Sequence, residues 1–395
     1  MTRHVDALLV TLVVFLACAG AEYVRPPPGR VIFTEHTKPA SHPQQVHVSV
    51  VGVNRMRVSW ITEDKHVRSV VEYGKISGNY TASATGDHTS YRYFLYSSGK
   101  IHHVKIGPLD RGTVSDYDIL LVPGDLSYAD AQQPLWDSFG RFVQKYASRR
   151  PWMVTEGNHE VEAAMALPDS PRPFTAYATR WRMPYEESGS PTSLYYSFDA
   201  AGGAVHVVML GSYADFNSSS EQYRWLARDL AGVDRVATPW VVVLLHAPWY
   251  NTNAAHEGEG EAMRKAMERL LYDARVDVVF AGHVHAYERF TRVHNNEANP
   301  CGPVHITIGD GGNREGLAFD FRKNHKLAPV SVMREASFGH GRLRVVNATA
   351  ARWTWHRNDD ADSTVRDEIW LESLATNGAC RQGSDAAANS ANDEL

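Results

Sequence analysis

The chain has 395 residues, of which 43% are hydrophobic, and its formal net charge is −5. This length predicts two or three domains, and the hydrophobic fraction is ample for a large buried core. The negative charge and the absence of a basic run argue against a nucleic-acid-binding protein.

Residues 1–21 have the pattern of a secretory signal peptide. Arg3 precedes the apolar stretch 7–18, and small residues at 17–21 offer cleavage sites. That stretch is too short to span a bilayer comfortably, and no later stretch is long and apolar enough to do so. Three glycosylation sequons agree with a secreted protein, at Asn79, Asn217 and Asn347.

An extended, proline-rich segment at 22–44 leads into a region of short strands at 45–114. Their alternation and the regular turn signals between them predict an antiparallel β-sandwich. No candidate catalytic residue lies in this region. The expected strands cover 46–51, 56–61, 69–73, 91–97 and 101–106.

The region 115–358 alternates strands and helices. Apolar residues at helical spacing in 135–146 predict a helix with these side chains in the core, and two further helices are expected at 221–230 and 261–274. Strands at 304–309, 341–346 and 351–356 are expected to build a second sheet, which suits an α-β-β-α sandwich. The strands of the first sheet are expected at 118–122, 152–155, 204–210, 240–245 and 276–281.

Four of these strands end in polar side chains. Parallel strands present their carboxyl ends at one edge of a sheet, where ligands bind. A strand-end Asp alone is more often a turn residue, and a lone His is more often a satisfied core residue, but four such ends in order predict a metal site. The candidate ligands offer oxygen and imidazole donors and no thiolate; they are Asp125, Tyr128, Asn158, His246, His283 and His285.

The order of these blocks resembles the calcineurin-like metallophosphoesterases. The blocks are Gly-Asp-x-x-Tyr at 124–128, Gly-Asn-His-Glu at 157–160, the histidine at 246 and Gly-His-x-His at 282–285. Tyr128 narrows the resemblance to the purple acid phosphatases, and 124–130 with 246–250 are similar to the large plant type. The resemblance implies a fibronectin-III-like domain at 45–114 and a metallophosphoesterase domain at 115–358.

The resemblance also implies the chemistry of the site. Fe(III) and a divalent zinc, manganese or iron ion would hydrolyse phosphate monoesters at acid pH, with a metal-bound hydroxide as nucleophile. Asp125 would bridge the two ions, and Tyr128 and His285 would bind the ferric ion. The divalent ion would be bound by Asn158, His246 and His283. His159 and His256 match positions that contact the phosphate and protonate the leaving group, and Glu259 matches an outer-sphere position.

The chain departs from this family at one block. The family carries an earlier Gly-Asp-x-Gly after the first catalytic strand, and its Asp is a further ferric ligand. The acids nearest upstream, Asp110, Asp116 and Asp118, follow no buried strand. We therefore expect an internal deletion of several dozen residues, which includes the first catalytic strand and impairs the iron side.

Three functions remain open at this point. The leading hypothesis is a phosphomonoesterase. The second is a phosphodiesterase or pyrophosphatase with the same metals, and the third is a non-catalytic glycoprotein that has lost its iron site.

Three cysteines are present, and Cys18 lies in the signal peptide. Cys301 and Cys380 could pair, stay free or link two chains, since the large plant enzymes are often homodimers. The tail 359–395 is rich in small polar residues from 376 onward, which predicts disorder there. It ends in Asn-Asp-Glu-Leu, which is similar to an endoplasmic-reticulum retrieval signal.

Overall fold

The computed structural model describes residues 31–109, 118–162, 172–358 and 363–380. The predicted signal peptide, Asp110, Asp116 and the Asn-Asp-Glu-Leu terminus lie outside these ranges. Among the described residues, no helix is both long and apolar enough to cross a membrane.

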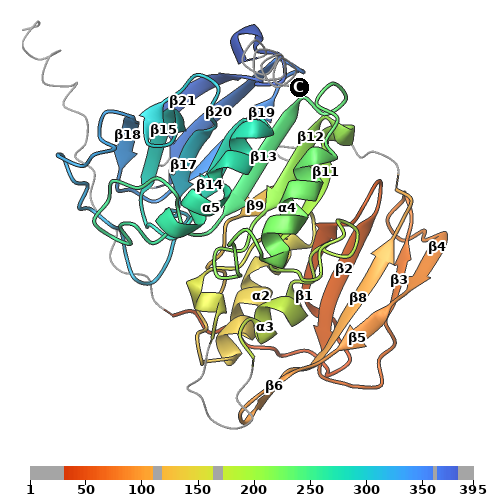
Figure 1. The fold of residues 1–395 in the computed structure, drawn as a ribbon. Coiled ribbons are helices and arrows are strands. Elements are labelled where there is room, and N and C mark those ends of the chain that lie inside the picture. Colours follow the sequence, from red (N-terminus) through yellow and green to blue (C-terminus); the bar gives the residue numbers. More distant parts are fainter. Residues whose placement is uncertain (1–30, 110–117, 163–171, 359–362, 381–395) are drawn as a thin grey trace, which may run out of the picture.

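The N-terminal region is built on an antiparallel sheet in the order β1-β2-β8-β5 (Figure 1). The residues expected as one strand at 91–97 instead form a hairpin, because Phe94 has a left-handed backbone with φ 52°. The strands of the main sheet are β1 (Gln44–Val50), β2 (Met56–Thr62), β5 (Asp87–Thr89) and β8 (Lys100–Ile106). The small pairs are β3 (Val70–Tyr73) with β4 (Ala82–Thr85), and β6 (Arg92–Tyr93) with β7 (Tyr96–Ser97).

An eight-stranded sheet forms the centre of the C-terminal region, in the order β11-β12-β13-β14-β17-β15-β16, with β18 paired to β15. Strands β12, β13, β14 and β17 run parallel. Every residue of β13 is buried, as a strand covered on both faces requires. The strands are β11 (Tyr196–Ala200), β12 (Val205–Met209), β13 (Trp240–Leu245), β14 (Val278–Ala281), β15 (Tyr287–His294), β16 (Glu297–Ala298), β17 (Val304–Ile308) and β18 (Ser331–Glu335).

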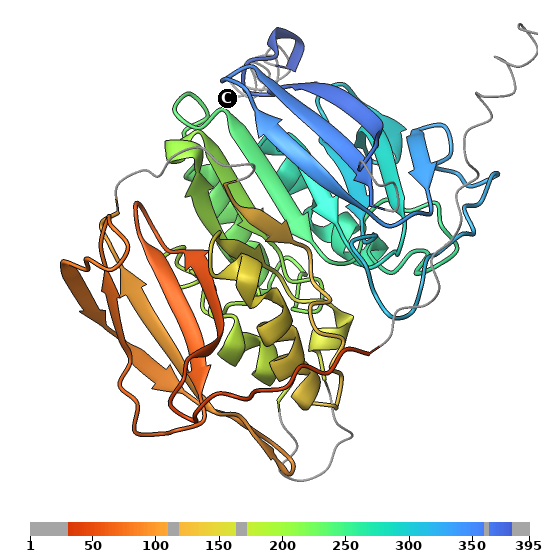
Figure 2. The ribbon, with the colours of Figure 1, turned by 180° about the vertical axis from the view of Figure 1, so that it is seen from behind.

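Different layers cover the two faces of this sheet. Val241, Val243 and Leu245 pack in one hydrophobic cluster with α4 (Glu221–Ala231) and α5 (Glu261–Asp273). Val242 and Leu244 pack in the other cluster with two smaller sheets and with α2 (Pro134–Ala147). Figure 2 shows this second side of the molecule. The smaller sheets are β9 (Leu120–Val122) with β10 (Trp152–Val154), and β19 (Gly339–Val345), β20 (Ala350–Arg357) and β21 (Val365–Glu372). The layered α/β architecture predicted from the sequence is confirmed.

Four strands differ from the expectation. Strands β9 and β10 were expected in the first sheet, but they pair with each other in a separate two-stranded sheet. The residues 304–309 were expected in the second sheet, but β17 pairs in parallel with β14 and belongs to the first. The parallel pairing is possible because β15 and β16 carry the chain away from β14 and back. The region expected as a tail from 359 contributes β21, which pairs with β20.

Strand β9 is less buried than its apolar sequence predicts. Leu120, Leu121 and Val122 are only half-buried, whereas β13 and β14 are fully buried. The reason is that β9 pairs with β10 alone, so one of its edges has no neighbouring strand among the described residues.

Helix α2 also differs in part from the expectation that its apolar residues are core. Leu135 and Val143 are buried, but Phe142 and Tyr146 are 52% and 51% exposed. Helical periodicity identifies which side chains share a face, but it does not determine whether another element covers that face.

Cys301 and Cys380 pair with one another, with their Cα atoms 5.4 Å apart. This pairing resolves the three alternatives in favour of an intrachain disulfide. It also holds the chain in place as far as Cys380, beyond residue 376, where disorder was expected to begin.

The N-terminal sheet docks on α3 (Thr175–Arg180) through buried polar groups. Arg180 donates to the Gln45 Oε1, Tyr91 Oη and Tyr96 Oη atoms at 2.6–2.9 Å. His103 contacts Ser59 Oγ through Nδ1 at 2.9 Å and the Thr179 carbonyl oxygen through Nε2 at 3.1 Å. Ion pairs nearer the surface add to this contact, from Arg182 to Asp87 and from Lys105 to Glu186.

Because His103 is buried at the contact between the two regions, we expect this contact to lose stability in acid. Burial, with smaller effects from His47 and Arg57, lowers the pKa of His103 to about 3. Protonation therefore favours the unfolded chain, in which the pKa is about 6.5, and the contribution of the neutral ring falls as the pH drops below that value. At pH 5 we expect the loss from this one group to be roughly 2 kcal/mol relative to pH 7.5.

Urea unfolding of the wild type and of His103→Gln at the two pH values measures this effect. Glutamine retains a donor and an acceptor but does not titrate, so the acid-dependent loss should shrink by roughly 2 kcal/mol. His42→Gln, at an exposed position, is the control. Equal pH dependence in all three proteins would contradict the prediction.

Candidate metal centre

Four strand ends meet at one edge of the molecule and carry the predicted ligands. The loop after β9 carries Asp125 and Tyr128, and the short helix Asn158–Glu160 follows β10. His246 directly follows β13, and the turn after β14 carries His283 and His285. The loops after β9 and β10 approach each other so closely that a Cβ atom on Gly157 would lie 2.2 Å from Asp125 Oδ1. Only glycine fits at this position.

Four predicted ligands converge around the His246 ring. Its Nε2 atom lies 3.1 Å from Asn158 Oδ1, 3.1 Å from His283 Nδ1 and 3.2 Å from Asp125 Oδ2. Ligand atoms that share one ion at bond lengths of about 2 Å lie roughly 3 Å from each other. The four groups therefore fit a single divalent cation.

Further contacts orient the two histidines of this cluster. His246 Nδ1 lies 2.7 Å from the Pro123 carbonyl oxygen, and His283 Nε2 lies 2.6 Å from Glu259 Oε2. When one ring nitrogen donates to an oxygen, the other nitrogen keeps its lone pair free for a metal. Both rings are thus held in the tautomer that a ligand needs.

Tyr128 and His285 form the second half of the centre. The Tyr128 Oη and His285 Nε2 atoms are 3.0 Å apart, and His285 Nδ1 lies 3.0 Å from the Gly316 carbonyl oxygen. Burial and then the Asp125 carboxylate raise the pKa of Tyr128, so the phenol keeps its proton unless a cation binds it. With the shared Asp125, this half has three of the predicted ligands.

The described residues supply no counterpart to the Asp expected from a Gly-Asp-x-Gly block. Asp118 is exposed and precedes β9, so it lies at the other end of the strand from Asp125, roughly 20 Å along the chain. Asp130 and Glu315 approach the site, but both contact His159, at 2.7 and 3.5 Å. Within the described ranges, the groups of three His, Cys, Asp or Glu that could hold an ion do not include His285.

The residues expected to contact phosphate border the centre. The His159 ring packs on Tyr128 with centroids 4.2 Å apart, and the His256 ring packs on His283 at 3.7 Å. His256 Nδ1 is 2.9 Å from Glu259 Oε1. His159 and His256 thus flank the two halves, and Glu259 links His256 to His283.

Four of these residues have a left-handed backbone that side chains rarely adopt. The φ angles are 56° at Asp125, 49° at Tyr128, 55° at His256 and 66° at His283. Such conformations cost about 1–3 kcal/mol each and persist only where the surrounding structure holds them.

Glu160 holds the most constrained part of this backbone, and the sequence analysis did not assign it a role. Its side chain is fully buried and accepts the N–H groups of Asp125, Leu126 and Gly157, each at 2.8 Å. Burial and the neighbouring Asp125 raise its pKa to about 7. Within the described ranges, no lysine or arginine forms an ion pair with Asp125 or Glu160. Two neighbouring carboxylates with imidazole groups beside them, among which His246 lies 3.2 Å from Asp125 Oδ2, are a second observation that fits bound cations.

Arg314 is also near the centre and was not identified from the sequence. Its Nη2 atom lies 2.7 Å from Asp130 Oδ2, and its guanidinium lies over the Tyr128 ring at 5.9 Å. Its position after Gly311-Gly312-Asn313 gave no signal of a link to Tyr128. The contact between Arg314 and Tyr128 depends on the tertiary fold, which brings the loop that carries Arg314 to the loop after β9.

The predicted glycosylation sites lie on exposed turns. Asn79 precedes β4, Asn217 precedes α4, and Asn347 lies between β19 and β20. In the last two, the sequon hydroxyl donates to the Asn side-chain oxygen, from Ser219 at 2.6 Å and from Thr349 at 2.9 Å.

Family models match three successive parts of the chain. Residues 43–121 match the purple acid phosphatase N-terminal domain, residues 100–287 the calcineurin-like phosphoesterase and residues 302–368 the iron/zinc purple acid phosphatase-like protein C. The first two matches overlap at 100–121, the stretch that links β8 to β9.

Individual proteins match along most of the chain. Purple acid phosphatase 22 of Arabidopsis thaliana is 55% identical over 420 positions, which cover 95% of this chain and 94% of the relative. Purple acid phosphatase 21 of the same plant is 50% identical, with 91% and 92% covered. A solved purple acid phosphatase from yellow lupin seeds, PPD1, shares the fold with a TM-score of 0.72 at 20% identity, with 84% and 74% covered. The 420 aligned positions exceed the 395 residues of this chain, so the first relative has residues with no counterpart here.

Glu160→Ala is expected to destabilise the protein by roughly 3–5 kcal/mol, because it leaves three buried N–H groups unpaired. Urea unfolding without added metal measures this loss. Zinc titration should show weaker binding, because Asp125 is no longer held. Glu72→Gln, at an exposed position, is the control and should change neither quantity. A loss below about 1 kcal/mol would show that water replaces the carboxylate.

Proposed function

Because the chain belongs to the purple acid phosphatase family, we propose that its metal centre is built for hydrolysis of phosphate monoesters at acid pH. The observation that supports this most directly is the convergence of Asp125, Asn158 and His283 on His246 Nε2 at 3.1–3.2 Å. A phosphoesterase of this family needs such a centre to bind a charged phosphate, and the described ligand atoms suit it.

We assign the ligands to two ions. Asn158, His246 and His283 with Asp125 would hold a divalent zinc, manganese or iron ion, since this set of donors accepts each of them. Tyr128 and His285, with Asp125 shared, would hold Fe(III). When bound, such a pair neutralises the charge of the phosphate and lowers the pKa of water.

The remaining residues would bind and protonate the substrate. His159 and His256 flank the two halves of the centre, where they would donate hydrogen bonds to the phosphate and a proton to the departing alcohol. Asp130 and Glu259 bind the Nδ1 atoms of these two rings, at 2.7 and 2.9 Å. Each carboxylate therefore fixes the orientation of its partner ring beside the centre.

We further propose that this chain is impaired in its iron half. Tyr128, His285 and the shared Asp125 are the ligands found there, and a trivalent ion depends on anionic ligands to neutralise its charge. Two observations support an internal deletion as the cause: the alignment longer than the chain, and the unpaired edge of β9.

Two alternatives differ from this proposal in measurable ways. A phosphodiesterase or pyrophosphatase would turn over diester or pyrophosphate substrates faster than monoesters at the same centre. A non-catalytic glycoprotein would bind the divalent ion without hydrolysing any of these substrates, and the incomplete iron half favours this outcome for the chain as written.

We propose that the protein enters the secretory pathway, with the sequons at Asn79, Asn217 and Asn347 as glycosylation sites and domains at 45–114 and 115–358. The terminal Asn-Asp-Glu-Leu would slow its exit from the endoplasmic reticulum. A homodimer would be held without an interchain bridge at Cys301, because this residue already pairs with Cys380.

The chain as written is expected to bind one divalent ion tightly, to lack purple colour and to have little phosphatase activity. Metal analysis, visible absorbance and phosphate release at acid pH test this, beside a version in which the segment of the 55% identical relative is restored. The restored version should hold two ions. Equal turnover with two ions in the shorter chain would refute the proposal.

In the restored version, Tyr128→Phe should abolish the visible charge-transfer band, because phenylalanine offers no phenolate to Fe(III). Circular dichroism should remain unchanged, since the two side chains have nearly the same volume. Tyr213→Phe, on the divalent side of the centre, is the matched control and should keep the band. A purple Tyr128→Phe protein would assign the colour to another ligand.

A further inference from the structure

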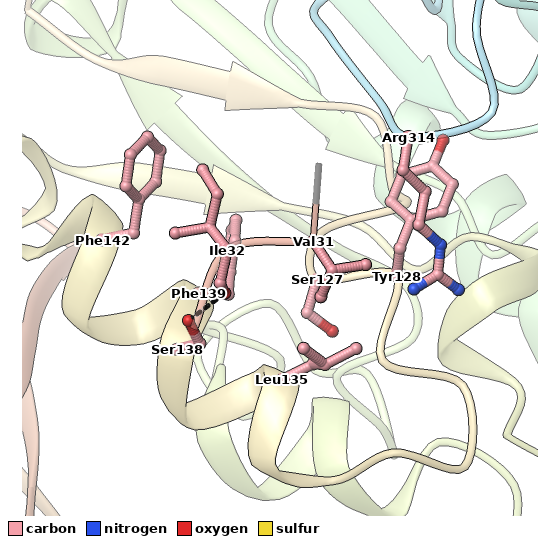
Figure 3. A pocket seen from close by; sticks show the side chains of 9 residues that line it. All are labelled: Val31, Ile32, Ser127, Tyr128, Leu135, Ser138, Phe139, Phe142 and Arg314. Atoms are coloured by element: carbon pink, nitrogen blue, oxygen red, sulfur yellow. Dashed lines mark hydrogen bonds between the residues drawn. The ribbon is translucent and has the colours of Figure 1, made fainter. Parts of the chain in front are cut away.

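Different polar groups border the two halves of the metal centre. Arg314 lies over the Tyr128 ring at 5.9 Å, and the two side chains lie together at one end of a groove (Figure 3). The divalent half is bordered by Tyr213, whose ring centroid lies 5.9 Å from that of His246. Tyr213 is neither one of the predicted ligands nor one of the residues expected to contact phosphate.

The backbone of Tyr213 is attached to the strand ends around it. Its N–H donates to Glu156 Oε1 at 3.1 Å. The preceding residue, Ser212, accepts the N–H groups of His246 and Ala247 on its Oγ atom, each at 3.0 Å. These bonds join the loop that carries Tyr213 to the end of β13, so the Tyr213 ring is held beside His246.

The Tyr213 hydroxyl is buried and has no hydrogen-bond partner among the described residues. Glu156 does not satisfy it, because Glu156 Oε2 is buried and equally unpaired in this part of the chain. A buried hydroxyl without a partner costs free energy, and in a native protein such a group calls for a ligand or an ordered water. Beside a centre that binds phosphate, an oxyanion is a suitable acceptor.

The charges near this hydroxyl agree with a position over the divalent half. The pKa of Tyr213 is raised by burial and, among other groups, by the Asp125 and Glu259 carboxylates. Asp125 contacts His246, and Glu259 contacts His283. A hydroxyl on which both carboxylates act therefore lies near both histidines. A phenol keeps its proton at acid pH, so this hydroxyl is able to donate a hydrogen bond.

We propose that Tyr213 is a further substrate-binding residue, whose hydroxyl donates a hydrogen bond to a phosphate oxygen at the divalent half of the centre. The ligand is a phosphate monoester or the inorganic phosphate released from it, so this inference rests on the proposed function. His159 packs on Tyr128 and His256 packs on His283. Tyr213 supplies a third donor, on the side of His246.

The test compares the binding of inorganic phosphate by the zinc-loaded chain and by zinc-loaded Tyr213→Phe in isothermal titration calorimetry. Phenylalanine keeps the ring and its packing but has no hydroxyl to donate. Phosphate affinity should therefore fall about tenfold, as expected for one hydrogen bond to a charged group. Zinc affinity, measured by competition with a zinc-binding dye, should not change, because Tyr213 is not a ligand.

Stability separates this role from a structural one. Because the hydroxyl is unpaired without a ligand, metal-free Tyr213→Phe should unfold in urea at the same concentration as the wild type or at a higher one. Tyr93→Phe is the matched control, since the buried Tyr93 hydroxyl donates to the Glu162 carbonyl oxygen at 2.9 Å. That variant should unfold at a lower urea concentration and bind phosphate as the wild type does.

Equal phosphate affinity in the wild type and Tyr213→Phe would overturn this inference and leave the proposed function intact. A clear loss of stability in metal-free Tyr213→Phe would also overturn it, since the hydroxyl would then have a structural partner. A zinc-loaded wild type that binds no phosphate would refute both. Phosphate binding that Tyr213→Phe weakens, in a chain that hydrolyses no phosphate ester, would support the role of Tyr213 while refuting the proposed function.

Discussion

The metal centre depends on one buried carboxylate that joins two strand ends. Glu160 follows β10, yet it accepts N–H groups from Asp125 and Leu126 after β9 as well as from Gly157. The Asp125 side chain is held in addition by the His159 N–H and by His246 Nε2, both at 3.2 Å. The charge is costly to bury, and bound cations would compensate it. Protein backbone and metal site therefore stabilise each other.

The two halves of the centre differ because their ligands come from the ends of different strands. The divalent half takes its ligands from β9, β10, β13 and β14, and the bonds to Pro123 and Glu259 orient both histidines. The other half relies on Tyr128 and His285 from two strand ends, with Asp125 shared. The proposed deletion of a strand would remove one ligand from this half only, because each strand contributes its own residues to the site.

The proposed deletion would also account for the local packing. Strand β9 is half-buried, and Phe142 and Tyr146 on α2 are half exposed. The remaining layers are complete: β13 is buried throughout and α4 and α5 cover its other face. The consequences of the proposed deletion would thus be confined to the side that carries Tyr128, His285 and the β9 edge.

The sequence by itself predicted the candidate ligands and the alternation of strands and helices, because apolar runs of strand length each lead to a donor side chain at His246, Asp125 or His283. It also identified the apolar side chains of α2 that lie together, since helical spacing shows which side chains share a face. Only the tertiary structure decided what covers that face, which cysteine Cys301 meets, and that Glu160 reaches the next strand end. Periodicity is a property of neighbours along the chain, whereas burial, pairing and the left-handed backbone depend on residues that are distant in sequence.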